Sequence, residues 1–79
     1  MKYVYNFKDG AKIELTETEN DYILTEYSDS GEKITCSLPN GYGIEEYTEE
    51  HYSKDSFSLG EIITIVKEEY GINEELQEE

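Results

Sequence analysis

Carboxylates and tyrosines alternate through residues 42–55, and they are the side chains of this sequence best suited to do chemistry. The group consists of Tyr42, Glu45, Glu46, Tyr47, Glu49, Glu50, Tyr52 and Asp55. Carboxylates three or four residues apart on a helix lie about 5–6 Å from one another, which is comparable with the spacing of phosphates along a nucleic-acid strand. Tyrosine adds contact area with a polar end and is enriched where proteins meet partners. We therefore predict that these residues bind a basic protein surface and compete there with nucleic acid.

The charge of the whole chain agrees with this interpretation but also allows a simpler one. The chain carries 20 acidic residues and six lysines, a net charge of −14, whereas about 2–8 charges keep a small domain soluble. Residues 40–79 hold −10 of that net charge. A run of like charges is also the ordinary composition of a solvated face. The acidic residues therefore either bind a basic partner or keep the protein soluble, and composition does not distinguish these two roles.

No other group of residues predicts a catalytic or metal-binding site. His51 is the only histidine, and with Glu50 and Asp55 nearby it lacks the fixed set of ligands that zinc requires. Cys36 lies in an apolar alternation, which favours a buried small hydrophobe over a nucleophile. The segment 41–43, Gly-Tyr-Gly, is too short for a nucleotide-binding loop. We expect no enzymatic activity, no cofactor and no metal ion.

The length of the chain limits what it can enclose. Its 79 residues form one small domain, and such a domain buries only about 60–65% of its unfolded surface. Little of that core is available to shape a deep active-site cavity. The opening residues lack the apolar stretch of a secretion signal, and no segment approaches the roughly 20 apolar residues of a membrane helix. We expect a cytoplasmic protein without membrane contact.

Alternating apolar residues in the first half predict a four-stranded antiparallel meander. The expected strands cover residues 2–8, 11–17, 21–28 and 32–38. A three-residue loop at 8–10, with its glycine in the left-handed conformation, pairs Tyr5 with Ile13 and Tyr3 with Leu15. This register places the apolar side chains of both strands on one face of the sheet.

The same reasoning sets the register of the next strands. A tight turn at residues 19–20 places Leu15 opposite Leu24. A loop at residues 29–31 would then place Leu24 opposite Cys36, with the fourth strand next to the third. The resulting sheet has a single apolar face for a helix to cover.

A helix over residues 59–70 is the best-signalled element of the second half. Ser58 and Glu61 form a capping box at its start, and Gly71 ends it in the left-handed conformation. One stripe of apolar side chains runs along the helix at the spacing of a face that packs on a sheet. The stripe consists of Leu59, Ile62, Ile63, Val66 and Tyr70. The sequence therefore predicts an α+β fold with this main C-terminal helix on one face of the sheet.

Two segments have weaker signals. Residues 44–52 form either a short helix or a loop with one helical turn, because a helix would bring Glu45 close to Glu49 and Glu46 close to Glu50. Each such like-charge pair costs about 0.2–0.5 kcal/mol. Residues 73–79 are short and acidic, so we expect a frayed tail that follows a single domain spanning residues 1–72.

The acidic segment also supports a comparison with known proteins. With Glu45, Glu46, Glu49 and Glu50 set among tyrosines, this small, arginine-free chain resembles the phage-encoded inhibitors of host nucleic-acid enzymes, which include the anti-CRISPR proteins. The resemblance implies a non-enzymatic inhibitor with an anti-defence role in the host cytoplasm. It implies a DNA-mimicking surface that binds a basic surface of a nucleic-acid-binding protein or nuclease complex, and no direct binding of nucleic acid.

A second function class remains open at this point. The face of the sheet away from the helix is expected to carry Val4, Ile23 and Tyr27, which is more apolar than a purely solvated face. A structural or regulatory module could form a homodimer through this face or through an exposed edge strand. Salt separates the two classes, because electrostatic mimicry weakens as ionic strength rises and a sheet-mediated dimer does not. The chain is expected to be a monomer or a homodimer.

Overall fold

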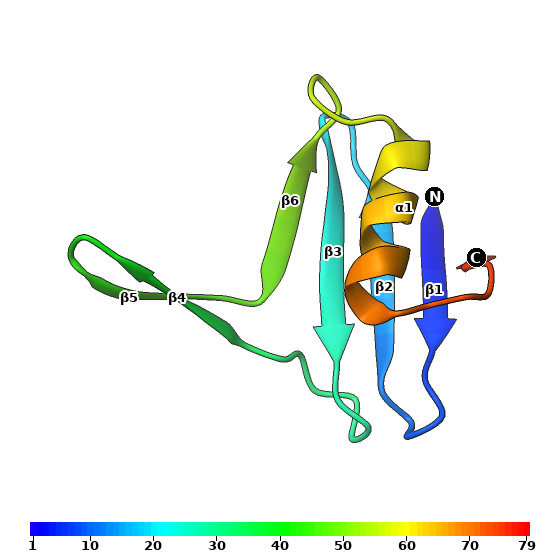
Figure 1. Ribbon diagram of the computed structural model, residues 1–79, viewed down its shortest axis with the longest axis horizontal. Coiled ribbons are helices and arrows are strands. Elements are labelled where there is room, and N and C mark those ends of the chain that lie inside the picture. The colour runs from blue at the N-terminus through cyan, green and yellow to red at the C-terminus, as the bar shows by residue number, and fades with distance from the viewer.

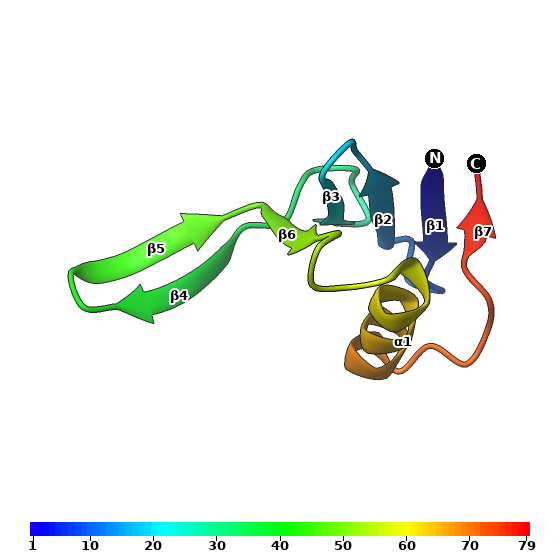
Figure 2. The ribbon, with the colours of Figure 1, turned by 90° about the horizontal axis from the view of Figure 1, so that it is seen from above.

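The computed structural model describes residues 1–79 and has an α+β fold, in which one helix covers one face of an antiparallel sheet (Figures 1 and 2). The strands are β1 (Lys2–Asn6), β2 (Lys12–Glu17), β3 (Asp21–Tyr27), β4 (Cys36–Asn40), β5 (Gly43–Tyr47), β6 (Glu49–Ser53) and β7 (Gln77–Glu78), and the helix is α1 (Leu59–Tyr70). Five strands form the main sheet in the order β6-β3-β2-β1-β7, and β4 and β5 form a separate two-stranded sheet. The α+β class is confirmed, but the sheet is larger than predicted.

The first hairpin has the predicted register. Tyr3 lies opposite Leu15 and Tyr5 lies opposite Ile13. Gly10 takes a left-handed φ of 97° in the loop, which a residue with a side chain adopts only with strain. The backbone N–H of Phe7 donates to the carbonyl oxygen of Ala11 at 2.8 Å. The loop chemistry therefore directs the aromatic and aliphatic side chains of β1 and β2 to the same face.

The turn between β2 and β3 is also as predicted. Leu15 lies opposite Leu24, and the N–H of Thr18 donates to the carbonyl oxygen of Asp21 at 2.8 Å across the tight turn. Leu15 and Ile13 are fully buried, and Leu24 is nearly so. These three side chains form the sheet's share of the core.

Helix α1 begins and ends where the sequence places it. The capping box between Ser58 and Glu61 is formed in both directions, and Gly71 closes the helix with a left-handed φ of 65°. The N–H of Ile72 donates back to the carbonyl oxygen of Lys67 at 2.8 Å, as in a Schellman motif. All five residues of the apolar stripe belong to the core or pack against it. This helix, the only one in the chain, is not long and apolar enough to cross a membrane.

The prediction of a fourth meander strand over residues 32–38 is wrong. Lys33 bridges Tyr27, and the N–H of Ile34 donates to the carbonyl oxygen of Glu26 at 2.9 Å, after which the chain leaves the sheet. β6 takes the place beside β3, so that Leu24 lies opposite Glu50 instead of Cys36. The apolar alternation of residues 34–38 fits a half-buried strand, but it does not specify which strand will pair with it.

The possible helix over residues 44–52 is also absent. This segment contains β5, a single bend residue and β6. The repulsion that weakens such a helix is smaller in strands, because Glu45 and Glu49 now belong to different sheets and Glu49 and Glu50 point to opposite faces of one sheet. The extended form therefore has less like-charge crowding than the helix would have.

Residues 73–79 differ from the frayed tail that we expected. Gln77 and Glu78 pair with Val4 and Tyr3 of β1, so the C-terminus lies beside the N-terminal strand (Figures 1 and 2). Leu76 is only 9% exposed. One apolar residue among the acids is enough to bring this segment back onto the sheet, because β1 offers it an unpaired edge.

Candidate functional site

A hairpin arm, residues 36–47, projects from the body of the molecule and carries part of the predicted site. β4 and β5 pair along their full length, from Cys36 opposite Tyr47 to Asn40 opposite Gly43. Figures 1 and 2 both show the arm extending away from the main sheet. At its tip the Oδ1 of Asn40 accepts a hydrogen bond from the N–H of Tyr42 at 2.8 Å. Residues 41–42 therefore form the tip of the arm, between the paired Asn40 and Gly43.

Apolar and acidic side chains lie next to each other on both faces of the arm. Leu38 lies directly opposite Glu45, so these two side chains share one face. Ile44 and Glu46 point to the other face, because successive strand residues alternate. Leu38 is 55% exposed and Ile44 is 71% exposed, while Tyr42 at the tip is completely exposed. The only other large hydrophobic residue with comparable exposure is Met1.

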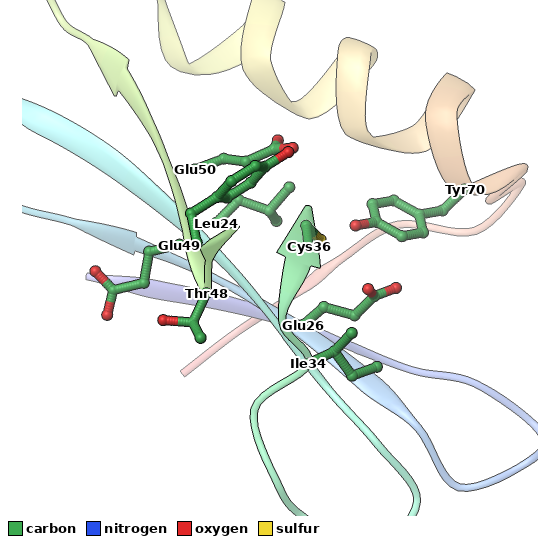
Figure 3. A pocket seen from close by; sticks show the side chains of 9 residues that line it. Leu24, Glu26, Ile34, Cys36, Thr48, Glu49, Glu50 and Tyr70 are labelled. Atoms are coloured by element: carbon green, nitrogen blue, oxygen red, sulfur yellow. The ribbon is translucent and has the colours of Figure 1, made fainter. Parts of the chain in front are cut away.

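A small hollow lies where the arm joins the body (Figure 3). Its lining comes from β3, the arm, β6, the end of α1 and the two segments that join the arm to the body. It consists of Leu24, Glu26, Ile34, Cys36, Tyr47, Thr48, Glu49, Glu50 and Tyr70. In Figure 3 the ring of Tyr70 reaches from the helix toward Cys36. The volume of the hollow is about 20 Å³, enough for about one water molecule. Sites that enclose small ligands occupy about 300–1,000 Å³, so this hollow is too small to enclose a substrate.

Two carboxylates, those of Glu50 and Glu26, act on the Glu69 carboxyl near this junction. Partial burial raises the pKa of the Glu69 carboxyl, and the charges of Glu50 and Glu26 raise it further. The pKa of Tyr70 is raised by burial and then by the charges of Glu26, Glu69 and Glu50. Burial likewise raises the pKa of Tyr47, with Glu50 as the next cause. The base of the arm is therefore a region of accumulated negative potential, here called the acidic junction and defined by Glu26, Glu50 and Glu69.

The lysines neutralise other parts of the surface. Lys54 pairs with Glu17 at 2.6 Å and Lys67 pairs with Glu75 at 3.4 Å. Two more lysines hold Glu14 on the face of the sheet away from the helix. Lys33 is the only one that pairs near the arm, with Glu49 at 3.2 Å. No lysine pairs with Glu45, Glu46 or any member of the acidic junction.

The structure separates the predicted site residues into three places. Tyr42, Glu45 and Glu46 lie exposed on the arm, and Tyr47 lies half-buried at its base. Glu49 and Glu50 lie on β6, on opposite faces of the sheet. Tyr52 packs edge-on against Phe57 at 5.5 Å and its hydroxyl donates to Glu50 at 2.9 Å, which makes it part of the core boundary. Asp55 is exposed in the loop before the helix.

Sequence reasoning missed four residues of this region. Leu38 and Ile44 lie on either side of the turn at residues 41–42, and a hairpin could have been recognised from apolar residues on both sides of such a turn. Glu26 and Glu69 come from β3 and α1, far from the acidic segment in sequence. No local signal connects these two glutamates to the arm.

His51, the only histidine, lies between two carboxylates on β6 and β3. Its ring nitrogens lie 3.6 Å from carboxylate oxygens of Asp21 and Glu49. No group of three or more histidine, cysteine, aspartate or glutamate side chains is arranged to hold a metal ion.

Comparisons with known protein families, with curated proteins and with solved structures found no match for the chain.

Proposed function

We propose that this protein is a non-enzymatic inhibitor that binds a basic, nucleic-acid-binding surface of another protein and competes there with nucleic acid. The observation that carries the proposal is the separation of charge. Every lysine except Lys8 is held in an ion pair, and none of these pairs neutralises the acidic junction or the outward carboxylates of the arm. A partner with clustered lysine and arginine complements such a surface and is steered toward it by the field.

The proximity of carboxylates at the junction supports the same proposal. Partial burial raises the pKa of Glu69, and the charges of Glu50 and Glu26 raise it further, so these two carboxylates repel the ionised Glu69 in the free protein. Cations of a partner would relieve that repulsion on binding, in the way that basic grooves neutralise phosphates. An anti-defence role such as that of an anti-CRISPR protein is the form of this function that the resemblance implies.

Homodimerisation through the uncovered face of the sheet is the second candidate, and the side chains on that face argue against it. Glu14 sits at the centre of the face with Lys2 at 2.8 Å and Lys12 at 3.1 Å. The ammonium group of Lys12 also lies 5.0 Å from the centre of the Tyr27 ring. These polar groups already satisfy one another and cover Val4, which is only 7% exposed. Burial against a second copy would remove them from water without new partners.

A capture experiment with two elution routes tests the proposal. The protein is immobilised, incubated with lysate of its native host, and eluted either by a salt gradient or by a mixed-sequence oligonucleotide. We expect nucleic-acid-binding proteins to be retained and to be released by both routes, with most of the release between about 50 and 200 mM salt. Glu45→Lys/Glu46→Lys should retain far less of them, while the control Glu74→Lys/Glu78→Lys at the C-terminus should retain them as the wild type does. Retained proteins that the oligonucleotide cannot release would overturn the proposal.

A further inference from the structure

The exposed apolar side chains of the hairpin arm are not explained by negative charge. Three of the four large hydrophobic residues that lie mostly in solvent are on these twelve residues: Leu38, Tyr42 and Ile44. Single exposed apolar residues are normal on a protein surface, but a group of them on one projecting element marks a contact region. A two-stranded hairpin is also only marginally stable in water by itself. A partner that covered the arm would therefore stabilise it.

The distribution of these side chains over both faces defines the shape of the partner. Leu38 and Glu45 occupy one face of the arm, and Ile44 and Glu46 occupy the other. A flat surface would cover only one face and leave the other apolar side chain in water. A groove with two walls covers both. The arm is thus suited to insertion between two walls.

The charge of the arm defines the rim of that groove. Glu45 and Glu46 have no lysine partner, and they lie beside the apolar side chains. If the tip of the arm enters the groove first, Glu45 and Glu46 follow Tyr42 and Ile44 and lie nearer the mouth of the groove, where lysine or arginine would pair with them. A second copy of this chain does not offer such a rim, because its net charge is −14. Pro39 also lacks an N–H, so β4 presents an interrupted edge to an added strand.

We propose that the hairpin arm inserts into a narrow groove of the partner that has an apolar or aromatic floor and a rim of lysine or arginine. This is the chemistry of grooves that hold single-stranded nucleic acid, where a basic track follows the backbone and aromatic side chains stack on the bases. A two-stranded ribbon fits the major groove of DNA, which is about 12 Å wide, so a protein groove of similar width would admit the arm. Leu38, Tyr42 and Ile44 take the place of bases, and Glu45 and Glu46 take the place of phosphates. The inference rests on the function proposed above and specifies the partner's site.

Two synthetic peptides of equal length and charge test this chemistry. One repeats Lys-Lys-Phe and the other repeats Lys-Lys-Ser, so that they differ only in apolar content. Binding to the full chain is measured by titration calorimetry at low and moderate salt. We expect the phenylalanine peptide to bind about ten-fold more tightly, because buried aromatic and aliphatic contacts commonly contribute this much at an interface.

A variant of the arm tests whether the preference for the phenylalanine peptide arises from the arm. Leu38→Thr/Tyr42→Ser/Ile44→Thr keeps strand-compatible residues in β4 and β5 and changes only exposed side chains. It should bind both peptides with the affinity that the wild type shows for the serine peptide. The matched control Ile23→Thr, on the uncovered face of the main sheet, should keep the ten-fold preference. Far-ultraviolet circular dichroism and the thermal midpoint check that each variant is folded.

The outcomes separate this inference from the proposed function. If both peptides bind the wild type equally, or if the arm variant keeps the preference, the insertion of the arm is refuted while binding to basic surfaces stands. If neither peptide binds, binding to basic surfaces fails and the inference fails with it. A preference that the arm variant loses and the control keeps supports both.

Discussion

Glu14 and Glu69 show how one residue type has opposite effects on stability at two positions. Glu14 is 7% exposed and lies between Lys2 and Lys12. Its hydrogen bond with Lys2, followed by that with Lys12, holds its pKa below the ordinary value of 4.5, against the opposing effect of burial. The pKa of Glu69 is raised by partial burial and then by the charges of Glu50 and Glu26. The first carboxylate therefore stabilises the fold when ionised, and the second opposes it.

Replacing Glu14 with glutamine tests the first effect. Glu14→Gln should lower the free energy of unfolding at pH 7 by about 1–2 kcal/mol, because a nearly buried, charge-assisted hydrogen-bond acceptor is lost. Since the folded-state pKa is lowered, this contribution is present above about pH 4.5 and is lost as the pH falls through the folded-state pKa. Urea denaturation at pH 7 and pH 3 should thus show a difference that shrinks at the lower pH. The exposed control Glu32→Gln should change the free energy by less than about 0.5 kcal/mol at both pH values.

Glu69→Gln should act in the opposite direction. Because the pKa of Glu69 is raised, its ionised form disfavours the fold, and the variant should be more stable than the wild type at pH 7. The gain should stay below about 1 kcal/mol, since this side chain is exposed and solvent screens its charge. Below the ordinary pKa the carboxyl is protonated in the folded and unfolded states, so the two proteins should converge. A variant that is less stable at pH 7 would contradict the acidic junction.

At the scale of elements, local signals were sufficient where a single turn or helix fixes the structure. The loop ending at Gly10, the capping box at Ser58 and the stop at Gly71 were all predicted correctly, because each is decided by residues a few positions apart. The strand that pairs with β3 on its outer side was not predicted correctly. Tyr52 is the only apolar side chain that β6 directs toward the core. β6 can pair with β3 only because the preceding residues, 36–47, leave the main sheet and form the arm. Pairings of this kind are non-local and leave no local pattern in the sequence.

The candidate site could be predicted to a similar extent. The acidic segment led to Glu45 and Glu46, which do lie on the exposed arm. Tyr52 was predicted as a contact residue, but its position opposite Tyr22 and against Phe57 makes it a packing residue. The position of Tyr52 follows from side-chain alternation in β6, which directs it toward the core, and β6 itself was not predicted.

The docking of β7 against β1 can be tested by replacing Leu76. Leu76→Ala should lower the free energy of unfolding by about 2 kcal/mol, because it removes a buried side chain that holds β7 against β1. Chemical denaturation measures this directly. The neighbouring exposed change Glu74→Ala should cost less than about 0.5 kcal/mol. Equal stability of the two variants would show that residues 73–79 are not docked in solution.

At the scale of the whole molecule, charge and shape are divided between two regions. The body holds every lysine except Lys8 in an ion pair and packs most of its apolar side chains in one core. The arm has exposed apolar side chains, free carboxylates and an acidic junction at its base. A small domain gains no stability from this arrangement, since exposed apolar residues and crowded carboxylates are both unfavourable in water. The arrangement is understandable if the arm and junction are completed by a basic partner.

The most direct test of that claim is displacement of nucleic acid from a captured partner. Fluorescence anisotropy follows a labelled oligonucleotide on the partner while the wild-type protein or Glu45→Lys/Glu46→Lys is added. We expect the wild type to release the oligonucleotide fully and the double variant to fail, while circular dichroism shows the same fold for both proteins. An oligonucleotide that stays bound at saturating wild-type protein, or that the double variant releases equally well, would contradict completion of the arm and junction by a basic partner.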